Sequence, residues 1–186
     1  MKAVERAKRI KMIIMDVDGT LTDGILYVLP DGEEVKGYNV KDGTGILLAH
    51  LAGIKTAIIT GKVSKALDKR AEKLGIGEVY QGFVDKKSIL YKILKKHSLK
   101  AEEVAFIGDD IGDLEIMKSV GFAGAVADAH PEIKRISHFI SNFEGGKGAV
   151  REFIEFILKA QNKWESLMKE VKNLKNNMEN KNENKS

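Results

Sequence analysis

The sequence predicts an α/β fold in which a doubly wound parallel sheet carries an inserted β-hairpin. Two observations support this fold class. From Asp42 onward, short apolar segments typical of buried strands alternate with helical segments, as in chains built from β-α-β units. Directly after the first strand, two β-rich runs flank a Pro-Asp-Gly turn, which indicates a hairpin over about residues 24–40. The expected architecture is therefore Rossmann-like with one insertion.

The first predicted strand is an apolar run that ends abruptly in Asp16-Val17-Asp18-Gly19-Thr20. Ligands bind at the carboxyl ends of strands in an open α/β sheet, so Asp16 and Asp18 are expected at the mouth of a site. Aspartate can attack phosphorus to form an aspartyl-phosphate, and a second carboxyl group can protonate the leaving oxygen. The competing interpretation is an ordinary strand-to-loop turn, in which Asp and Gly serve turn chemistry alone.

The remaining elements follow from hydrophobic periodicity. Strands are expected over residues 55–59, 78–81, 104–107, 121–126 and 138–140, and helices over residues 43–51, 64–74, 85–97, 114–119 and 131–135. A last amphipathic helix is expected from Lys147 to Met168. Beyond Lys172 the chain consists largely of Asn, Lys, Glu and Ser, so a single domain over residues 1–172 and a disordered polar tail over residues 173–186 are expected.

Composition excludes several functional classes. The absence of cysteine rules out disulfides and thiolate metal sites, and it fits a cytoplasmic protein. No apolar run approaches the roughly 20 residues of a membrane helix, so no membrane partner is expected. The net charge of +4 comes from residues 1–11, at +4, and residues 161–186, at +2, and it leaves the body at −2. A basic excess confined to the ends is weak support for nucleic-acid binding, which is not expected.

Three predicted strands end in polar residues of the kind that hold a metal and a phosphate. These ends are residues 16–18, Thr60-Gly61-Lys62 and the segment Gly108-Asp109-Asp110-Ile111-Gly112-Asp113. If the strands are parallel neighbours, their acids converge and would repel one another without a cation. Oxygen ligands favour a hard ion, and Mg²⁺ keeps several waters, which leaves room for a phosphate oxygen.

A phosphoryl group also needs donors for its remaining oxygens, because its transfer is catalysed mostly by positioning and charge stabilisation. Thr60 can supply a hydroxyl group. Lys86, at the start of a predicted helix, can supply an ammonium group. Lys87 is its immediate neighbour, so spacing alone does not choose between the two lysines.

Taken in order, these four motifs resemble those of the haloacid dehalogenase superfamily of phosphatases over residues 12–126. The resemblance implies that Asp16 is the nucleophile and Asp18 the general acid and base. It also implies a Mg²⁺ ion held by Asp16, Asp109 and the main-chain carbonyl group of Asp18. Thr60 and Lys86 would bind the phosphate, and Asp110 and Asp113 would support the metal ligands from behind.

Further segments are similar to the small capless members of this superfamily, which extends the resemblance to nearly residue 158. They are residues 39–43, 59–62, 70–75 and 145–152. The resemblance implies a homotetramer whose hairpins pack together and in which a neighbouring subunit helps to close each site. It also implies hydrolysis of a phosphorylated sugar acid, 3-deoxy-D-manno-octulosonate 8-phosphate. The residues expected to bind it are Asp18, Asn39, Val40, Lys41, Asp42, Gly43, Lys62, Arg70 and Lys86.

Two positions depart from the subgroup pattern, since Lys62 and Leu47 stand where arginine is expected. A lysine is a point charge and lacks the bidentate fork of arginine, which leaves another sugar phosphate, such as a nonulosonate 9-phosphate, as an alternative substrate. Two non-enzymatic alternatives are a phosphoacceptor signalling domain and an oligomeric scaffold with an inactive site. Asp18 argues against the first, because an acid two residues from the nucleophile serves turnover.

Two other features receive simpler interpretations. His50, His97, His130 and His138 lack metal-ligand spacing and are expected to have structural roles. The glycine-rich loop over residues 145–148 is either a flexible lead-in to the last helix or part of a site. Because the chain has no inserted cap domain, the segment around Gly146 and Lys147 is expected to reach the active site of a neighbouring subunit.

Overall fold

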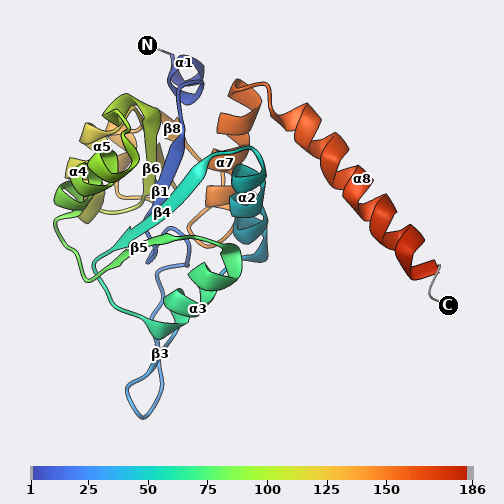
Figure 1. The fold of residues 1–186 in the computed structure, drawn as a ribbon. Coiled ribbons are helices and arrows are strands. Elements are labelled where there is room, and N and C mark those ends of the chain that lie inside the picture. Colours follow the sequence, from blue (N-terminus) through green and yellow to red (C-terminus); the bar gives the residue numbers. More distant parts are fainter. Residues whose placement is uncertain (1, 184–186) are drawn as a thin grey trace.

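A computed structural model describes the backbone of residues 2–183 and the side chains of residues 2–173 (Figure 1). The strands are β1 (Met12–Met15), β2 (Tyr27–Val28), β3 (Glu34–Val35), β4 (Lys55–Thr60), β5 (Glu78–Gln81), β6 (Val104–Gly108), β7 (Phe122–Ala125) and β8 (Phe139–Ile140). The α-helices are α1 (Ala3–Ala7), α2 (Val40–Leu51), α3 (Lys65–Leu74), α4 (Lys86–His97), α5 (Leu114–Ser119), α6 (Pro131–Ile136), α7 (Ala149–Ala160) and α8 (Trp164–Glu183). Short 3₁₀ turns lie at η1 (Ala101–Glu103) and η2 (Ile111–Asp113).

Six strands form one parallel sheet in the order β5-β4-β1-β6-β7-β8, which confirms the predicted fold class. Helices α2 and α7 cover one face of this sheet, and α4 and α5 cover the other (Figure 1). Met15, the last residue of β1, is paired with Ile58 of β4 on one side and Ile107 of β6 on the other. The loops that leave these three strands therefore start side by side at one edge of the sheet.

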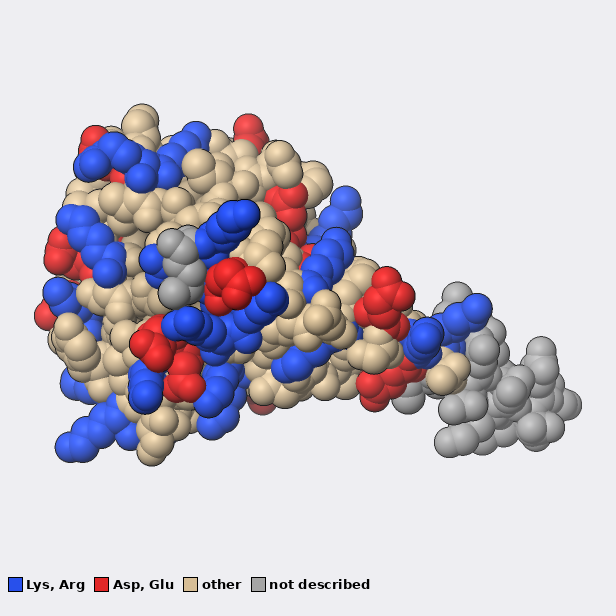
Figure 2. Space-filling model, turned by 90° about the horizontal axis from the view of Figure 1, so that it is seen from above, with Lys and Arg blue, Asp and Glu red and all other residues tan. Residues whose placement is uncertain are grey.

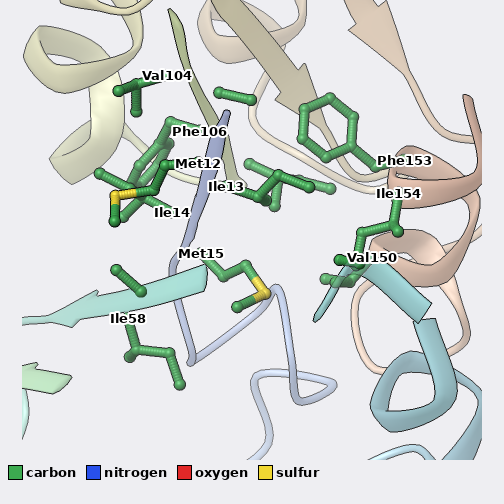
Figure 3. Close-up of a cluster of buried hydrophobic side chains, with 14 of the residues drawn as sticks. Met12, Ile13, Ile14, Met15, Ile58, Val104, Phe106, Val150, Phe153 and Ile154 are labelled. Carbon is green, nitrogen blue, oxygen red and sulfur yellow. The ribbon is translucent and has the colours of Figure 1, made fainter. Parts of the chain in front are cut away.

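The hydrophobic core surrounds β1, whose four residues are all fully buried (Figure 3). Side chains from β6 and α7, among them Phe106 and Phe153, lie around this strand. Phe153 also stacks on Phe122 of β7, with ring centroids 5.2 Å apart. Burial of this kind fixes the central strand tightly, and truncating a buried Phe to Ala typically costs about 3–5 kcal/mol.

The inserted hairpin is confirmed, with shorter strands than the sequence suggested. Strands β2 and β3 pair antiparallel over two residues each, with Tyr27 opposite Val35. The turn between them is closed by a hydrogen bond from the Leu29 N–H to the Glu33 carbonyl group, at 2.9 Å. The hairpin projects from the body of the molecule (Figure 1). Its large apolar side chains are exposed, namely Ile25, Leu26, Tyr27, Val28, Leu29 and Val35.

The prediction of one continuous helix from Lys147 to Met168 is wrong. Helix α7 ends at Ala160, α8 starts at Trp164, and between them Asn162 adopts a left-handed conformation with φ of +55°. Such a residue ends a helix, because its carbonyl and amide groups leave the helical path. The hydrophobic spacing continued across the break because Leu167 of α8 is buried in the core as well.

Helix α8 points away from the body and continues to Glu183 (Figure 1). Lys172, the predicted end of the domain, is therefore not the end of an element. Residues 184–186 lie outside the described residues, and disorder of the segment 173–186 stays a prediction. Within the described part of the chain, no helix is both long and apolar enough to cross a membrane.

Basic side chains gather on the face of the molecule that carries α1, where they alternate with acidic ones (Figure 2). Near α1 in the sequence, Lys8 pairs with Glu5 at 2.9 Å and Lys11 with Glu103 at 2.6 Å. Strand β1 starts at this end of the molecule and runs toward the hairpin (Figure 1). The excess of positive charge near the N-terminus thus lies at the end opposite the loops that follow β1, β4 and β6.

Candidate active site

Three aspartates from the ends of β1 and β6 form a compact cluster. One carboxylate oxygen from each of Asp16, Asp109 and Asp113 lies within 4.8 Å of the others. Burial, followed by the charges of Asp16 and Asp113, raises the pKa of Asp109 to about 8. Burial, followed by the charge of Asp16, raises the pKa of Asp113 to about 6. Both pKa shifts therefore come first from burial and second from repulsion between the carboxylates, and a set of clustered carboxylate oxygens fits a hard divalent cation such as Mg²⁺.

Lys86 provides the positive charge in this cluster. Its buried ammonium group donates to Asp16 Oδ1 at 2.6 Å and to Asp113 Oδ1 at 2.5 Å. Burial alone lowers the pKa of Lys86, but the charges of Asp16 and Asp113 outweigh burial and raise it above its ordinary value. Lys87 points elsewhere and pairs with Glu115 at 3.8 Å on the surface. The structure therefore selects Lys86 over Lys87, a choice that spacing left open.

Lys86 is placed by the start of α4. The side chain of Asp85 caps this helix by accepting a hydrogen bond from the Ser88 N–H at 3.1 Å. As the first residue of the helix, Lys86 lies at its N-terminus, and its side chain extends to the end of β1. The positive end of a helix disfavours a lysine, so the contacts with Asp16 and Asp113 must compensate for this position.

Asp18 has a separate environment from Asp16. Its carboxylate is half-buried and forms an ion pair with Lys36, which follows the second strand of the hairpin. The clustered carboxylates of the described residues do not include Asp18. A metal-binding role for Asp18 thus depends on its main-chain carbonyl group and stays a prediction.

The loop after β1 is shaped to approach Asp109 closely. Gly19 has φ of +91°, and a Cβ atom there would collide with the Asp109 carboxylate. The Thr20 hydroxyl group donates to Asp109 Oδ1 at 3.0 Å, and the Asp109 N–H donates to Asp113 Oδ2 at 3.1 Å. Sequence reasoning gave no role to Thr20, although it lies in the Asp-x-Asp-Gly-Thr motif. Its signal was a hydroxyl residue next to a glycine at a strand end.

The end of β4 contributes Thr60, which lies in the sheet next to the end of β1. Thr60 is buried, and its hydroxyl oxygen accepts a hydrogen bond from the Lys62 N–H at 3.4 Å. The side chain of Lys62 is exposed. A depression beside it is lined by residues 31–34 of the hairpin and residues 62–66. The hairpin and the loop after β4 therefore form a shared wall.

Several predicted substrate-binding residues are engaged in packing. The buried carboxylate of Asp42 accepts a hydrogen bond from the Arg151 N–H at 2.8 Å and so caps α7. Gly43 is buried against the Arg70 guanidinium group, which donates to the Asn39 carbonyl group at 3.4 Å. The structure thus presents neither Asp42 nor Gly43 to solvent at the site, because α2 needs them to hold α3 and α7.

The other predicted residues differ in exposure. Val40 and Lys41 are exposed at the start of α2. The Asn39 side chain caps α2 through the Lys41 N–H at 2.8 Å and donates to the Gly146 carbonyl group at 2.9 Å. Asp110 is also exposed and accepts a hydrogen bond from the Ile111 N–H, so its side chain is not among the clustered carboxylates.

The glycine-rich loop packs against the site of its own chain. Gly145 lies so close to the loop after β1 that a Cβ atom would collide with the Gly19 carbonyl oxygen. The Gly146 N–H donates to the Thr20 carbonyl group at 3.0 Å. The Gly146 backbone is therefore used within its own chain. The expectation that the segment around Gly146 and Lys147 reaches a neighbouring subunit stays a prediction. Lys147 is exposed.

The four histidines have structural contacts, as expected. His138 Nδ1 accepts a hydrogen bond from the Ala123 N–H at 2.9 Å, and His130 Nδ1 accepts one from the Glu132 N–H at 3.2 Å. His50 Nε2 lies 2.6 Å from the Thr56 hydroxyl group, and His97 Nε2 lies 3.1 Å from Glu78 Oε1.

An aspartate pair after the first strand, a buried lysine and an acidic cluster on a parallel sheet define the site of a haloacid dehalogenase-like hydrolase. The family model described by that name matches residues 71–154. The chain is 44% identical to the 3-deoxy-D-manno-octulosonate 8-phosphate phosphatase KdsC of Yersinia pestis over 162 residues, and these residues are 87% of each of the two chains. The KdsC protein of Escherichia coli strain K12 is 42% identical over 160 residues, which cover 86% of this chain and 85% of that protein. This chain therefore belongs to the 3-deoxy-D-manno-octulosonate 8-phosphate phosphatase family of haloacid dehalogenase-like hydrolases.

Solved structures agree with this assignment. The crystal structure of the Yersinia pestis phosphatase has a TM-score of 0.86 and covers 88% of each chain. The phosphatase of Moraxella catarrhalis, in complex with a magnesium ion, a phosphate ion and a KDO molecule, has a TM-score of 0.89 at 39% identity. It covers 91% of this chain and 97% of its own. The predicted superfamily, fold and phosphatase class are confirmed.

Proposed function

We propose that this protein is a Mg²⁺-dependent phosphomonoesterase that hydrolyses 3-deoxy-D-manno-octulosonate 8-phosphate to the free sugar acid and phosphate. The observation that carries the proposal is the separation of two acids in one loop. Asp16 belongs to a cluster of carboxylates and forms an ion pair with Lys86, whereas Asp18 is not in this cluster and forms an ion pair with Lys36. Two carboxyl groups in different environments can take different chemical roles. The names of the relatives and the magnesium, phosphate and KDO in one of them support the choice of substrate and metal.

The reaction has two displacements at phosphorus. In the first, an Asp16 carboxylate oxygen forms a bond to phosphorus, the bond from phosphorus to the sugar oxygen breaks, and protonated Asp18 gives its proton to that oxygen. In the second, Asp18 takes a proton from water, the water oxygen bonds to phosphorus, and the aspartyl-phosphate bond breaks. The first step leaves Asp16 phosphorylated and Asp18 deprotonated, and the second step returns both residues to their starting states.

Other groups hold the phosphate during these steps. Lys86 and Thr60 would bind its oxygens. Asp16, Asp109 and the Asp18 carbonyl group would hold Mg²⁺, and Asp113 would fix Lys86 and the Asp109 N–H. When bound, the metal ion would neutralise the carboxylates and orient the phosphate.

The test is phosphate release from a panel of sugar-acid phosphates, with Mg²⁺ and with a chelator. Release from the octulosonate 8-phosphate with Mg²⁺ alone is the expected result. A preference for a nonulosonate 9-phosphate would change the proposed substrate and leave the proposed phosphatase activity in place. Lys62 and Leu47, which stand where arginine is expected, make this the second candidate substrate. A stable aspartyl-phosphate without turnover would indicate a signalling domain, and an absence of reaction would indicate a scaffold.

We also propose a homotetramer with the hairpins at its centre. The support is the set of exposed apolar side chains on the hairpin, including Ile25 before β2 and Tyr27 on β2, in an element with two residues per strand. Such a hairpin is marginal alone and gains stability by packing against others. Light scattering of the purified protein tests this directly, and a fully active monomer would contradict it. A cytoplasmic location stays a prediction.

A further inference from the structure

We propose that Lys36 is a positioning residue that holds the carboxyl group of Asp18 where it exchanges a proton with the leaving oxygen. This inference rests on the proposed function, in which Asp18 is the general acid and base. Lys36 comes from the exit of the inserted hairpin. The inference therefore gives the hairpin a part in catalysis within its own chain.

The burial of Lys36 is the first observation. Neighbouring hairpin side chains such as Val28 and Val35 are exposed, yet the Lys36 side chain is only 4% exposed. Lysine is rarely buried unless it is paired. Its ammonium group donates to the Asp18 carboxylate, whose side chain is 23% exposed. The hairpin thus places one charged group inward, and that group meets the acid.

The second observation is that the two acids have one lysine each. Lys86, from α4, forms ion pairs with Asp16 and Asp113, and Lys36 forms an ion pair with Asp18. Both lysine side chains are nearly inaccessible to solvent, and they come from unrelated elements. A cation at a fixed place draws the Asp18 carboxylate to one orientation. That orientation is separate from the cluster of Asp16, Asp109 and Asp113, which does not include Asp18.

The position of Lys36 suits the departure of the leaving group. The attacking and leaving oxygens lie roughly in line on opposite sides of phosphorus, so the proton donor must stand away from Asp16. Lys36 directly follows β3, and the hairpin projects from the end of the molecule toward which β1 runs (Figure 1). General acid catalysis depends on this placement, since the donor must be within hydrogen-bond reach of the oxygen.

The dependence on the leaving group is the test, because a positioned acid matters most for poor leaving groups. The variants are Lys36→Met and Lys36→Arg, and the matched control is Lys95→Met, which alters an exposed lysine on α4. kcat/KM is measured with Mg²⁺ on a series of aryl phosphates from p-nitrophenyl to phenyl phosphate and on the octulosonate 8-phosphate. This ratio reports only steps up to the transfer of the phosphoryl group to Asp16, and the aryl series removes sugar binding from the comparison.

For Lys36→Met we expect a loss of about 10–100-fold on phenyl phosphate and the sugar phosphate, and of less than about threefold on p-nitrophenyl phosphate. Lys36→Arg should recover most of the loss, and Lys95→Met should match wild type. An equal loss on every substrate, or a loss confined to the sugar phosphate, would overturn the inference in favour of a structural or a substrate-binding role. If Lys36→Met does not fold, as judged by its melting temperature, Lys36→Gln takes its place.

The inference and the proposed function fail in distinguishable ways. If wild type hydrolyses no phosphomonoester with Mg²⁺, the proposed function fails and the inference fails with it. A different outcome would contradict the inference alone. In that outcome wild type is active and Asp18→Asn shows the steep leaving-group dependence, but Lys36→Met does not.

Discussion

The acidic cluster and the inserted hairpin are the two halves of the site, and they are supported in opposite ways. Asp16 and Asp109 follow strands that are buried on both faces and paired on both sides. The hairpin has two residues per strand, pairs only with itself and exposes most of its apolar side chains. The half proposed to attack phosphorus is therefore held firmly within one chain. The half proposed to handle the proton rests on an element with little support from the rest of the chain.

The largest expected loss of activity comes from a substitution in the acidic cluster. Asp16→Asn removes the nucleophile, so turnover of the sugar phosphate should fall by about 10⁴-fold or more. The fold should persist, because β1 is held by its apolar residues. Steady-state kinetics with a melting curve as control checks both statements. Substantial remaining turnover in a folded variant would show that Asp16 is not the nucleophile.

Removal of the metal tests the cluster as a unit. Activity should disappear in chelator and return with Mg²⁺, and Mg²⁺ at about 100 times its dissociation constant should stabilise the protein by about 2.7 kcal/mol. Calorimetry with and without Mg²⁺ measures the second effect. Full activity in chelator would contradict the assignment.

The same cluster predicts a pH dependence of stability in chelator. The pKa of Asp109 is raised from 3.8 in the unfolded chain to about 8 in the fold, so the folded protein binds more protons between these values. Stability should therefore fall as pH rises from about 4 to about 8. Asp109→Asn should remove much of this fall, and Mg²⁺ should reverse it. Melting temperatures across this range provide the measurement.

Asp18→Asn breaks the proton-handling half. A general acid and base contributes about 10²–10⁴-fold, so turnover should fall by that factor and less than for Asp16→Asn. Wild-type turnover in this variant would refute the role of Asp18.

Charges placed on the hairpin sharpen the comparison, because they leave the acidic cluster untouched. Ile25→Asp or Tyr27→Asp should lower the solution mass of the oligomer, with a loss of activity of about tenfold through misplacement of Lys36 and Asp18. Light scattering and kinetics on one sample relate the two effects. A variant that is monomeric yet fully active would separate the hairpin from catalysis.

The smallest effect is expected from deleting residues 173–186. The segment is mostly polar and follows Met168, which packs on the core and is the last residue to do so among the described side chains, so melting temperature and activity should stay close to wild type. A loss of more than about threefold in kcat/KM would assign the segment a role at the site.

The sequence was sufficient for the half with the acidic cluster and insufficient for the contacts between distant segments. Strands β4, β5 and β6 fall within one residue of their predicted ends, because apolar periodicity and strand-end residues are local signals. The role of Asp42 was not predictable in this way. Its buried carboxylate caps α7 through Arg151, which is 109 residues away, and such a contact leaves no local pattern.

Lys36 illustrates the same limit at the site. The sequence analysis gave Lys36 no role, because it lies in a β-rich run and strand alternation does not reveal an inward charge. The break between α7 and α8 was missed for a related reason, because Leu167 continues the helical spacing after the chain has turned at Asn162.

The contacts that join the start of α2 to the segment around the start of α7 also set the moment at which the fold is completed during synthesis. Asn39 and Asp42 emerge from the ribosome early, but their partners Gly146 and Arg151 follow only 107 and 109 residues later. At roughly 5–20 residues per second, this delay lasts about 5–20 s. Throughout that interval β1 has no partner from α7, and its apolar residues are available to chaperones. A nascent chain of this protein therefore stays inactive until its last quarter has been translated.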